Sequence, residues 1–274
     1  MTYKTILLHL DPGNASRRRT AIAIELACAF DAHLIGLYYV HPFPVPGYTR
    51  PDLGSNYVTA WRRLWETNRS KTRAAFQDAV ERARVSYEWR CKEPLLGETF
   101  ETHARYADLA ILGQTDPESN ETYAASDFPE FVCLATGRPV LVAPYAGECA
   151  TVGERVLVAW NASREATRAV TDSLPLLQRA KQVTVLAINP KGRGELPCAD
   201  IAWYLARHGV KVEAMHTHSS EVDTGNVLLS HAADMAADLL VIGCYGHSRL
   251  KEMALGGVTR TLLKEMTLPV LMSH

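Results

Sequence analysis

The sequence lacks the features that would place it at once among nucleic-acid-binding or membrane proteins. Its 29 Lys and Arg residues balance 30 Asp and Glu residues, and the formal net charge is −1. That balance gives no general attraction to nucleic acid or to an anionic membrane surface. No apolar run approaches the roughly 20 residues that span a bilayer. We therefore expect neither nucleic acid nor a membrane as a partner.

The sequence also lacks a disulfide or zinc framework. Its six cysteines are scattered and no C-x-x-C pair occurs, which favours free thiols and no metal site. The apolar stretch before Asp11 is too short for a secretion signal and is typical of a first core strand. We therefore expect a cytoplasmic protein, and the hydrophobic share of 47% with 22% charged residues is ordinary for a globular one.

Neither a Walker loop nor the dinucleotide-binding fingerprint is present, but a different glycine pattern stands near the C-terminus. Gly243 and Gly246 follow an apolar run that predicts a buried strand, and Gly256 and Gly257 precede a predicted helix over Val258–Met266. Glycines let the backbone approach an anion, and the start of a helix offers free N–H groups. The pattern favours a phosphate site, with simple turn glycines as the alternative.

The two halves of the chain can be laid over each other, with five apolar segments in the same order. The matched pairs are Thr5–Asp11 with Arg155–Asn161, His33–Val40 with Lys181–Ile188, Val85–Arg90 with Val210–Met215, Ala107–Gly113 with Ala237–Gly243, and Arg138–Val142 with Leu268–Met272. Strands that alternate with helical segments predict parallel sheets with helices on both faces. We therefore predict an α/β protein of two domains, residues 1–147 and 153–274, with a polar linker over 146–153.

Ligands of such sheets bind at the carboxyl ends of the strands, where the strand order reverses. That rule places Asp11 and Asn161, each at the end of a first strand, beside the loop after the fourth strand of the same half. In the second half this loop is the glycine stretch that begins at Gly243. The second half is therefore the better candidate for a ligand site.

At these residues the chain resembles a tandem universal stress protein, and the resemblance covers nearly the whole chain. Nucleotide-binding members carry glycine, two residues, glycine, nine residues, glycine and then serine or threonine, and Gly243, Gly246 and Gly256 have this spacing. The resemblance implies two doubly wound, five-stranded parallel sheets with strand order 3-2-1-4-5, a fold like that of adenine-nucleotide α-hydrolases. It also implies ATP or a related adenine nucleotide as ligand, and leaves Mg²⁺ open.

Carried over position by position, the resemblance divides the nucleotide among the residues of the second half. The adenine and the ribose would contact Ala159, Trp160, Asn161 and Ile188. The ribose and the first phosphate would contact Ile242, Gly243 and Gly246. The phosphates would be bound by Gly256, Gly257, Val258 and Thr259. Two positions depart from the family pattern. Gly257 stands where a hydroxyl side chain is usual, and Asn161 stands where many members have aspartate.

The first half departs further from the family pattern. Gly113 is followed by an acidic stretch that includes Asp116, Glu118 and Glu121 and lacks the second and third glycines. Carboxylates repel phosphate. We therefore predict that the first half does not bind nucleotide.

Four other features have plainer interpretations. The sequence has paired histidines at His216 and His218, a loop cysteine at Cys244 and an amphipathic stretch from Tyr57 to Arg84. It also has a basic segment from His247 to Lys251, which is either a solvated loop or, through His247, Arg249 and Lys251, a contact to the terminal phosphates. The histidines lack a third ligand at a recognisable spacing, and we interpret Cys244 as a buried loop residue. The amphipathic stretch predicts a helix packed through Trp61, Leu64, Trp65 and Phe76.

No general base or metal cluster is evident, so we assign no catalytic or metal-binding residue and predict a regulator or sensor, with slow ATP hydrolysis left open. The alternatives are an interaction or structural protein with an empty cleft, and an α-hydrolase-like enzyme of ATP pyrophosphate chemistry. In the family, fifth strands pair between repeats. Pairing of Val140–Val142 with Val270–Met272 would give an intrachain pseudo-dimer, and a homodimer stays open.

Overall fold

The computed structural model describes residues 2–40, 51–91, 99–116, 127–147, 149–190, 198–219, 222–245 and 257–274, without the side chains of 51–58. The first half contains β1 (Thr5–Leu10), α1 (Ala15–Phe30), β2 (His33–Tyr38), α2 (Pro51–Ala83), β3 (Tyr87–Cys91), α3 (Phe100–Ala104), β4 (Leu109–Gly113), α4 (Phe128–Thr136) and β5 (Val140–Ala143). The second contains β6 (Arg155–Ala159), α5 (Arg164–Leu177), β7 (Gln182–Ile188), α6 (Ala199–Arg207), β8 (Val212–Thr217), α7 (Thr224–Asp234), β9 (Leu239–Gly243), α9 (Val258–Glu265) and β10 (Val270–Ser273).

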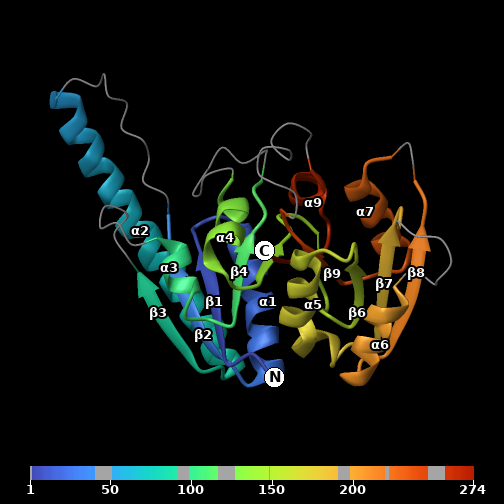
Figure 1. Ribbon diagram of the computed structural model, residues 1–274. Helices are drawn as coiled ribbons and strands as arrows, with labels where there is room; N and C mark the ends of the chain where they lie inside the picture. The colour runs from blue at the N-terminus through green and yellow to red at the C-terminus, as the bar shows by residue number, and fades with distance from the viewer. Residues whose placement is uncertain are drawn as a thin grey trace.

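The strands form one sheet of ten in the order β3-β2-β1-β4-β5-β10-β9-β6-β7-β8 (Figure 1). Within each half all neighbours are parallel and lie in the order third, second, first, fourth, fifth, as the resemblance implies. The two predicted sheets are thus continuous with each other. They join through β5 and β10, which pair antiparallel with Leu141 opposite Leu271. The pairing predicted for these strands is confirmed.

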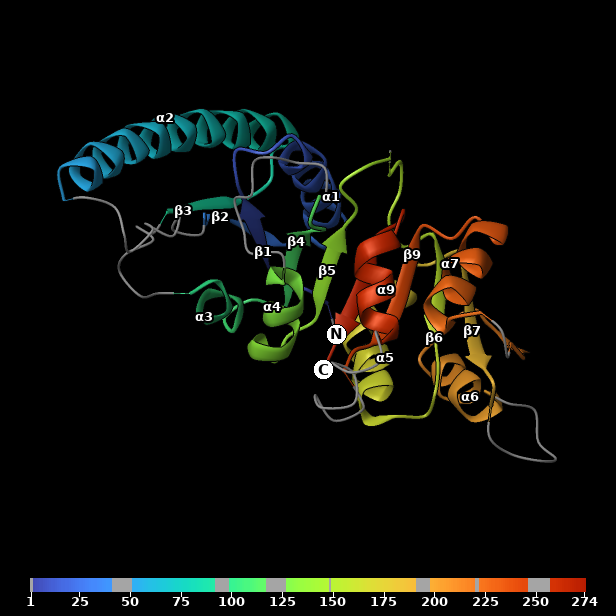
Figure 2. The same ribbon diagram turned by 90° about the horizontal axis from the view of Figure 1, so that it is seen from above.

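Helices cover both faces of the sheet because successive strand residues point to opposite sides. In β1, Ile6 and Leu8 belong to the core under α1, α2, α5 and α6, whereas Leu7 belongs to the core under α3, α4, α7 and α9. Figure 2 shows α1 and α2 on one side of the first half and α3 and α4 on the other. Both faces of the inner strands are therefore buried, which explains their nearly continuous apolar sequences, whereas the edge strands β3 and β8 are more polar and more exposed.

Further contacts tie the halves together beside the strand pairing. The Tyr3 hydroxyl donates a hydrogen bond to the carbonyl oxygen of Asp172 on α5 at 2.6 Å. The side-chain amide of Gln114, just after β4, donates to the carbonyl oxygen of Lys264 on α9 at 3.1 Å, and Gln114 is itself buried. The Gln114 bond fixes the end of β4 against α9, and the Tyr3 bond fixes the segment before β1 against α5.

The halves differ most at the helix between their second and third strands. Figure 1 shows α2 extending beyond the sheet, whereas its counterpart α6 is short. Trp65 and Phe76 are buried on α2 as predicted, but Leu64 is 59% exposed, so its predicted packing is wrong. Leu64 falls on the outer side of the helix, next to Trp65 in sequence but not on its face. None of the helices in the described part of the chain has the length and hydropathy of a bilayer-crossing segment.

Candidate functional site

A cavity of about 180 Å³ lies at the carboxyl ends of the second-half strands. Its wall is built from the ends of β6, β7 and β9 and from the starts of α5, α7 and α9. The lining residues are Ala159, Trp160, Asn161, Ser163, Ala166, Leu186, Ile188, Thr224, Leu228, Ile242, Gly243, Tyr245, Val258 and Thr259. The fold thus brings together most of the residues that the sequence pointed to.

The other predicted site residues are glycines. Gly257 is the N-cap residue of α9 and adjoins the cavity wall at Val258 without being part of the wall itself. Gly246 and Gly256 lie outside the described residues, as do His247, Arg249 and Lys251. Their roles toward phosphate therefore stay predictions.

Gly243 lets α5 approach the end of β9. A Cβ atom at this position would lie 2.3 Å from the backbone nitrogen of Ala166 and 2.4 Å from the carbonyl carbon of Glu165. Real Cβ contacts are never so short, and backbone atoms cannot move aside as a side-chain tip can. The glycine is therefore required by helix packing, a reason separate from phosphate binding.

The turn after β6 fixes Asn161 and the start of α5. The Ser163 N–H donates to Asn161 Oδ1 at 3.1 Å, and the Ala166 N–H donates to Ser163 Oγ at 3.1 Å. Ser163 is thus the N-cap of α5, a position that favours serine because its oxygen satisfies a free N–H group. The sequence patterns did not identify this serine as part of the cavity wall.

The described wall of the cavity carries no charged side chain. Its aliphatic part comes from residues such as Ile188, Leu228 and Val258, and its polar groups are amides and hydroxyls, among them Asn161 and Thr259. Such a wall suits a neutral ring with a few hydrogen-bonding atoms. It offers neither a carboxylate base nor a metal ligand set, and no group of three His, Cys, Asp or Glu residues forms a metal site in the described part of the chain.

The corresponding place in the first half is filled by side chains. In the strand registers Ile6 matches Val156, so His9 stands where Ala159 stands in the second half. By the same registers Tyr39 corresponds to Ile188. Phe128, the first residue of α4, corresponds to Val258, the first residue of α9. Three small or aliphatic residues of the cavity wall, Ala159, Ile188 and Val258, are thus replaced by rings.

These rings pack against one another and, among the described residues of the first half, occupy the place of the second-half cavity. The His9 ring lies 5.0 Å from the Phe128 ring and 5.6 Å from the Phe100 ring, measured between centroids. Tyr39 stacks on Phe128 at 5.7 Å with an interplanar angle of 12°. Ring contacts of this kind add to the stabilisation from burial alone. The first-half cleft is therefore closed by an aromatic cluster of His9, Tyr39, Phe100 and Phe128.

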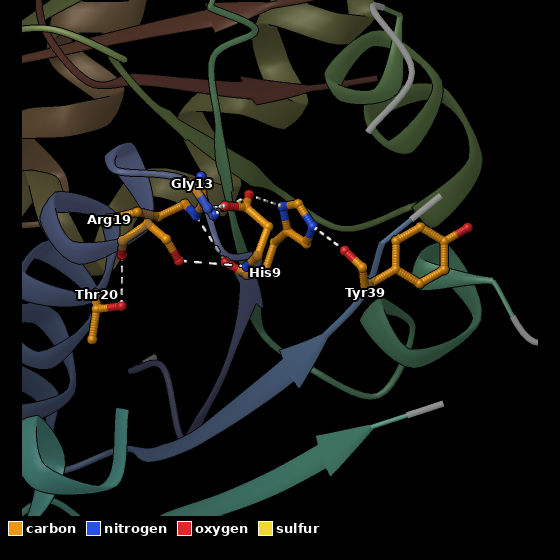
Figure 3. Close-up of polar contacts among 7 residues, drawn as sticks. His9, Gly13, Arg19, Thr20 and Tyr39 are labelled. Atoms are coloured by element: carbon orange, nitrogen blue, oxygen red, sulfur yellow. Dashed lines mark hydrogen bonds and ion pairs between the residues drawn. The ribbon is translucent and has the colours of Figure 1, made fainter. Parts of the chain in front are cut away.

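A buried ion pair completes the closure (Figure 3). Arg19, which is 3% exposed, donates to the His9 carbonyl oxygen at 2.8 Å and to Asp11 Oδ2 at 2.7 Å. The Arg19 guanidinium lies against Gly113, where a Cβ atom could not fit. In the second half, the position of Arg19 is taken by Ala169 and that of Asp11 by Asn161. The first half therefore has the charged pair, and the second half has neither of its two members.

The pair sets the protonation of its neighbours. Burial, helped by the Arg19 charge, lowers the pKa of His9 to about 4, so the ring is neutral at pH 7. Its Nε2–H donates to the Tyr39 carbonyl oxygen at 2.8 Å because a carbonyl can only accept. Burial alone would raise the pKa of the Asp11 carboxyl, but the Arg19 charge and the other nearby donors outweigh burial and hold that pKa below its usual value.

Three residues singled out by sequence lie elsewhere. His216 and His218 are exposed on β8 and just after it, with ring centroids 6.0 Å apart. They are not part of the cavity wall. Cys244 is buried, as predicted, and its N–H donates to the Ser273 carbonyl oxygen at 2.9 Å, which extends the pairing of β9 with β10.

Comparison with known proteins agrees with this architecture. Structures of universal stress proteins share the fold over nearly the full length. One from Archaeoglobus fulgidus superposes with a TM-score of 0.72 at 14% identity, covering 98% of this chain and 95% of that one. A Pseudomonas aeruginosa protein named as a candidate universal stress protein gives 0.57 at 15% identity, covering 99% and 93%. At these identities the likeness shows the fold alone.

The sequence match concentrates in the second half, which also holds the cavity. Residues 153–274 match the model of the universal stress protein family. A curated relative, universal stress protein Slr1230 of Synechocystis sp., is 29% identical over 83 residues, which is 30% of this chain. The match spans 27% of that relative's own length.

Proposed function

We propose that the protein is a cytoplasmic stress-response regulator that binds ATP or a related adenine nucleotide in its second repeat. Its repeats would be residues 1–147 and 153–274. The observation that carries the proposal is the uncharged cavity at the switch point of the second half. The residues that the family pattern assigns to the adenine and ribose side, including Ala159 and Ile188, are found together in its wall.

The size of the cavity limits the part of the ligand that it encloses. At about 180 Å³ it is smaller than the ~300–1,000 Å³ of most ligand sites. It therefore suits the adenine ring, with the ribose near Asn161 and the phosphates toward the start of α9. The first N–H groups of α9 face that side, and a helix start favours anions. Gly246 and Gly256 would complete this phosphate side.

The same wall supports binding rather than efficient catalysis. Hydrolysis of ATP needs a group that positions or deprotonates water, and usually a metal held by carboxylates. Neither lines the cavity among the described residues. Asn161 can accept or donate a hydrogen bond to a ribose hydroxyl but contributes no charge to Mg²⁺. We therefore propose a sensing or regulatory role, with hydrolysis at most slow.

The small volume also favours a second candidate, an interaction protein whose cleft stays empty. Calorimetric titration with ATP, with mass spectrometry of the purified protein for bound nucleotide, separates the two. The sharpest variant is Ala159→His, which introduces the residue that closes the first half. We expect it to weaken ATP binding at least tenfold, whereas Thr171→His, on the exposed side of α5, should not change it. No nucleotide by either method would favour the empty cleft.

A further inference from the structure

A second cavity, of about 740 Å³, lies in the first half on the other side of Asp11 from the aromatic cluster. It is formed between the start of α1 and the middle of α2, which lie side by side in Figure 2. None of its lining residues belongs to the aromatic cluster or to the second-half cavity. Its volume falls within the range of small-molecule sites, ~300–1,000 Å³.

The charges in this cavity are unbalanced toward positive. Asp11 is neutralised by Arg19, and Asp78 is paired with Arg82, both at 2.7 Å. In the described part of the chain no carboxylate forms an ion pair with the two other cations of the wall, Arg17 on α1 and Lys71 on α2. Two helices thus contribute one unpaired cation each to the same space.

The start of α1 carries positive charge where a helix ordinarily avoids it. Arg17, Arg18 and Arg19 follow one another in its first turns, and no acidic residue is present in the first turn. The positive end of the helix dipole disfavours cations there. Arg18 and Arg19 each donate to a backbone carbonyl oxygen, which explains their positions. Arg17 donates to no carbonyl oxygen in the described structure. An anion bound between Arg17 and the start of α1 would offset the repulsion between the arginine charge and the helix dipole.

The other residues of the wall indicate which chemical groups a ligand would carry besides its anionic group. Asn68 and Thr72 supply amide and hydroxyl groups, while Pro12, Ala75 and Ala79 supply accessible apolar surface. The Asn14 side chain makes no capping hydrogen bond to α1, so the first N–H groups of the helix are not satisfied by it. An inorganic ion would contact only the cationic residues of this groove. A phosphate attached to a ring would contact both the cationic and the apolar residues.

We propose that this groove between α1 and α2 binds a small organic phosphate, with the phosphate between Arg17 and Lys71 and the ring against Ala75 and Ala79. The site is independent of the adenine-nucleotide cleft and occupies the half whose own cleft is closed. The long helix α2, which has no equal in the second half, forms one of its walls. The proposal thus gives the asymmetry of the two halves a ligand-binding role.

Calorimetric titration with phenyl phosphate, which joins a ring to a phosphate monoester, tests the proposal. We expect saturable binding in the wild type and in Ala159→His, because closing the second-half cleft leaves the groove unchanged. In the double variant Arg17→Ala/Lys71→Ala the affinity should fall at least tenfold. The matched control Arg62→Ala/Lys211→Ala removes the same charge from exposed positions outside the groove and should bind as the wild type does.

Thermal unfolding of both double variants checks that they remain folded, which we expect because all four side chains are exposed. No saturable binding of phenyl phosphate to the wild type would overturn the proposal. An equal loss of affinity in the two double variants would also overturn it, because it would show a dependence on total charge alone. Loss of ATP binding in Ala159→His with phenyl phosphate binding retained would support the two sites as separate.

Discussion

Replacing Arg19 by methionine tests whether the ion pair of the first half contributes strongly to stability. Methionine keeps most of the buried volume but removes both hydrogen bonds and the charge. Asp11, whose side chain is 13% exposed, is then left with the N–H of Gly13 and without a cation. Removing one partner of a buried pair costs roughly 3–5 kcal/mol. We expect a loss of this size in the free energy of unfolding at pH 7.

A second arginine provides the control. Arg82 lies 2.7 Å from Asp78, the same distance, but the two side chains are 73% and 67% exposed. Exposed helix pairs of this spacing contribute at most ~0.5 kcal/mol. Urea unfolding followed by tryptophan fluorescence should therefore show a large shift for Arg19→Met and almost none for Arg82→Met. Equal shifts would refute the argument that burial decides the contribution of the pair.

The second half suggests how the damage can be repaired. It carries Asn161 where the first half has Asp11, and Ala169 where the first half has Arg19. Asp11→Asn in the Arg19→Met background removes the unpaired charge while keeping an oxygen for the Gly13 N–H. We expect it to recover ~1–3 kcal/mol, the cost of leaving a buried polar group unsatisfied. A double variant no more stable than Arg19→Met would contradict this.

Three further predictions follow from burial. The pKa of His9 is lowered from 6.5 to about 4, so between these pH values the unfolded chain binds one proton more than the folded chain. The free energy of unfolding should therefore fall by about 3 kcal/mol as the pH drops from 6.5 to 4. Urea unfolding of His9→Gln should show a smaller fall. Gly243→Ala should cost ~1–3 kcal/mol in the same assay because its Cβ meets backbone; an unchanged midpoint would exclude that packing. A thiol reagent should label exposed Cys28 in the native protein but not Cys133 or Cys244, which are buried. Rapid labelling of either would show that this core opens.

Much of the fold follows from the sequence because its signals are local or repeated. Apolar runs of four to seven residues became strands, and the five matched pairs along the chain became two sets of strands with one order. The pairing of β5 with β10 was implied by the family resemblance, and it covers two apolar strand edges. The burial of Leu64 was predicted wrongly. The apolar face of the helix is broader than the surface that contacts the core, so some of its apolar residues stay exposed.

The candidate site was predicted in part, and for an identifiable reason. Ala159, Ile188 and Thr259 follow strands or begin a helix at one edge of the sheet, so topology alone brings them together. The acidic stretch after Gly113 predicted that the first half does not bind nucleotide, but it did not predict the rings that occupy the cleft. His9 and Phe128 are more than a hundred residues apart, and nothing local to either indicates that they meet.

A crystal structure of the protein soaked with ATP and Mg²⁺ would show which half binds the nucleotide. We expect an adenine ring in the second-half cavity, between Ile188 and Val258, and none beside His9. An adenine ring beside His9, or an empty second-half cavity at saturating ATP, would contradict this expectation.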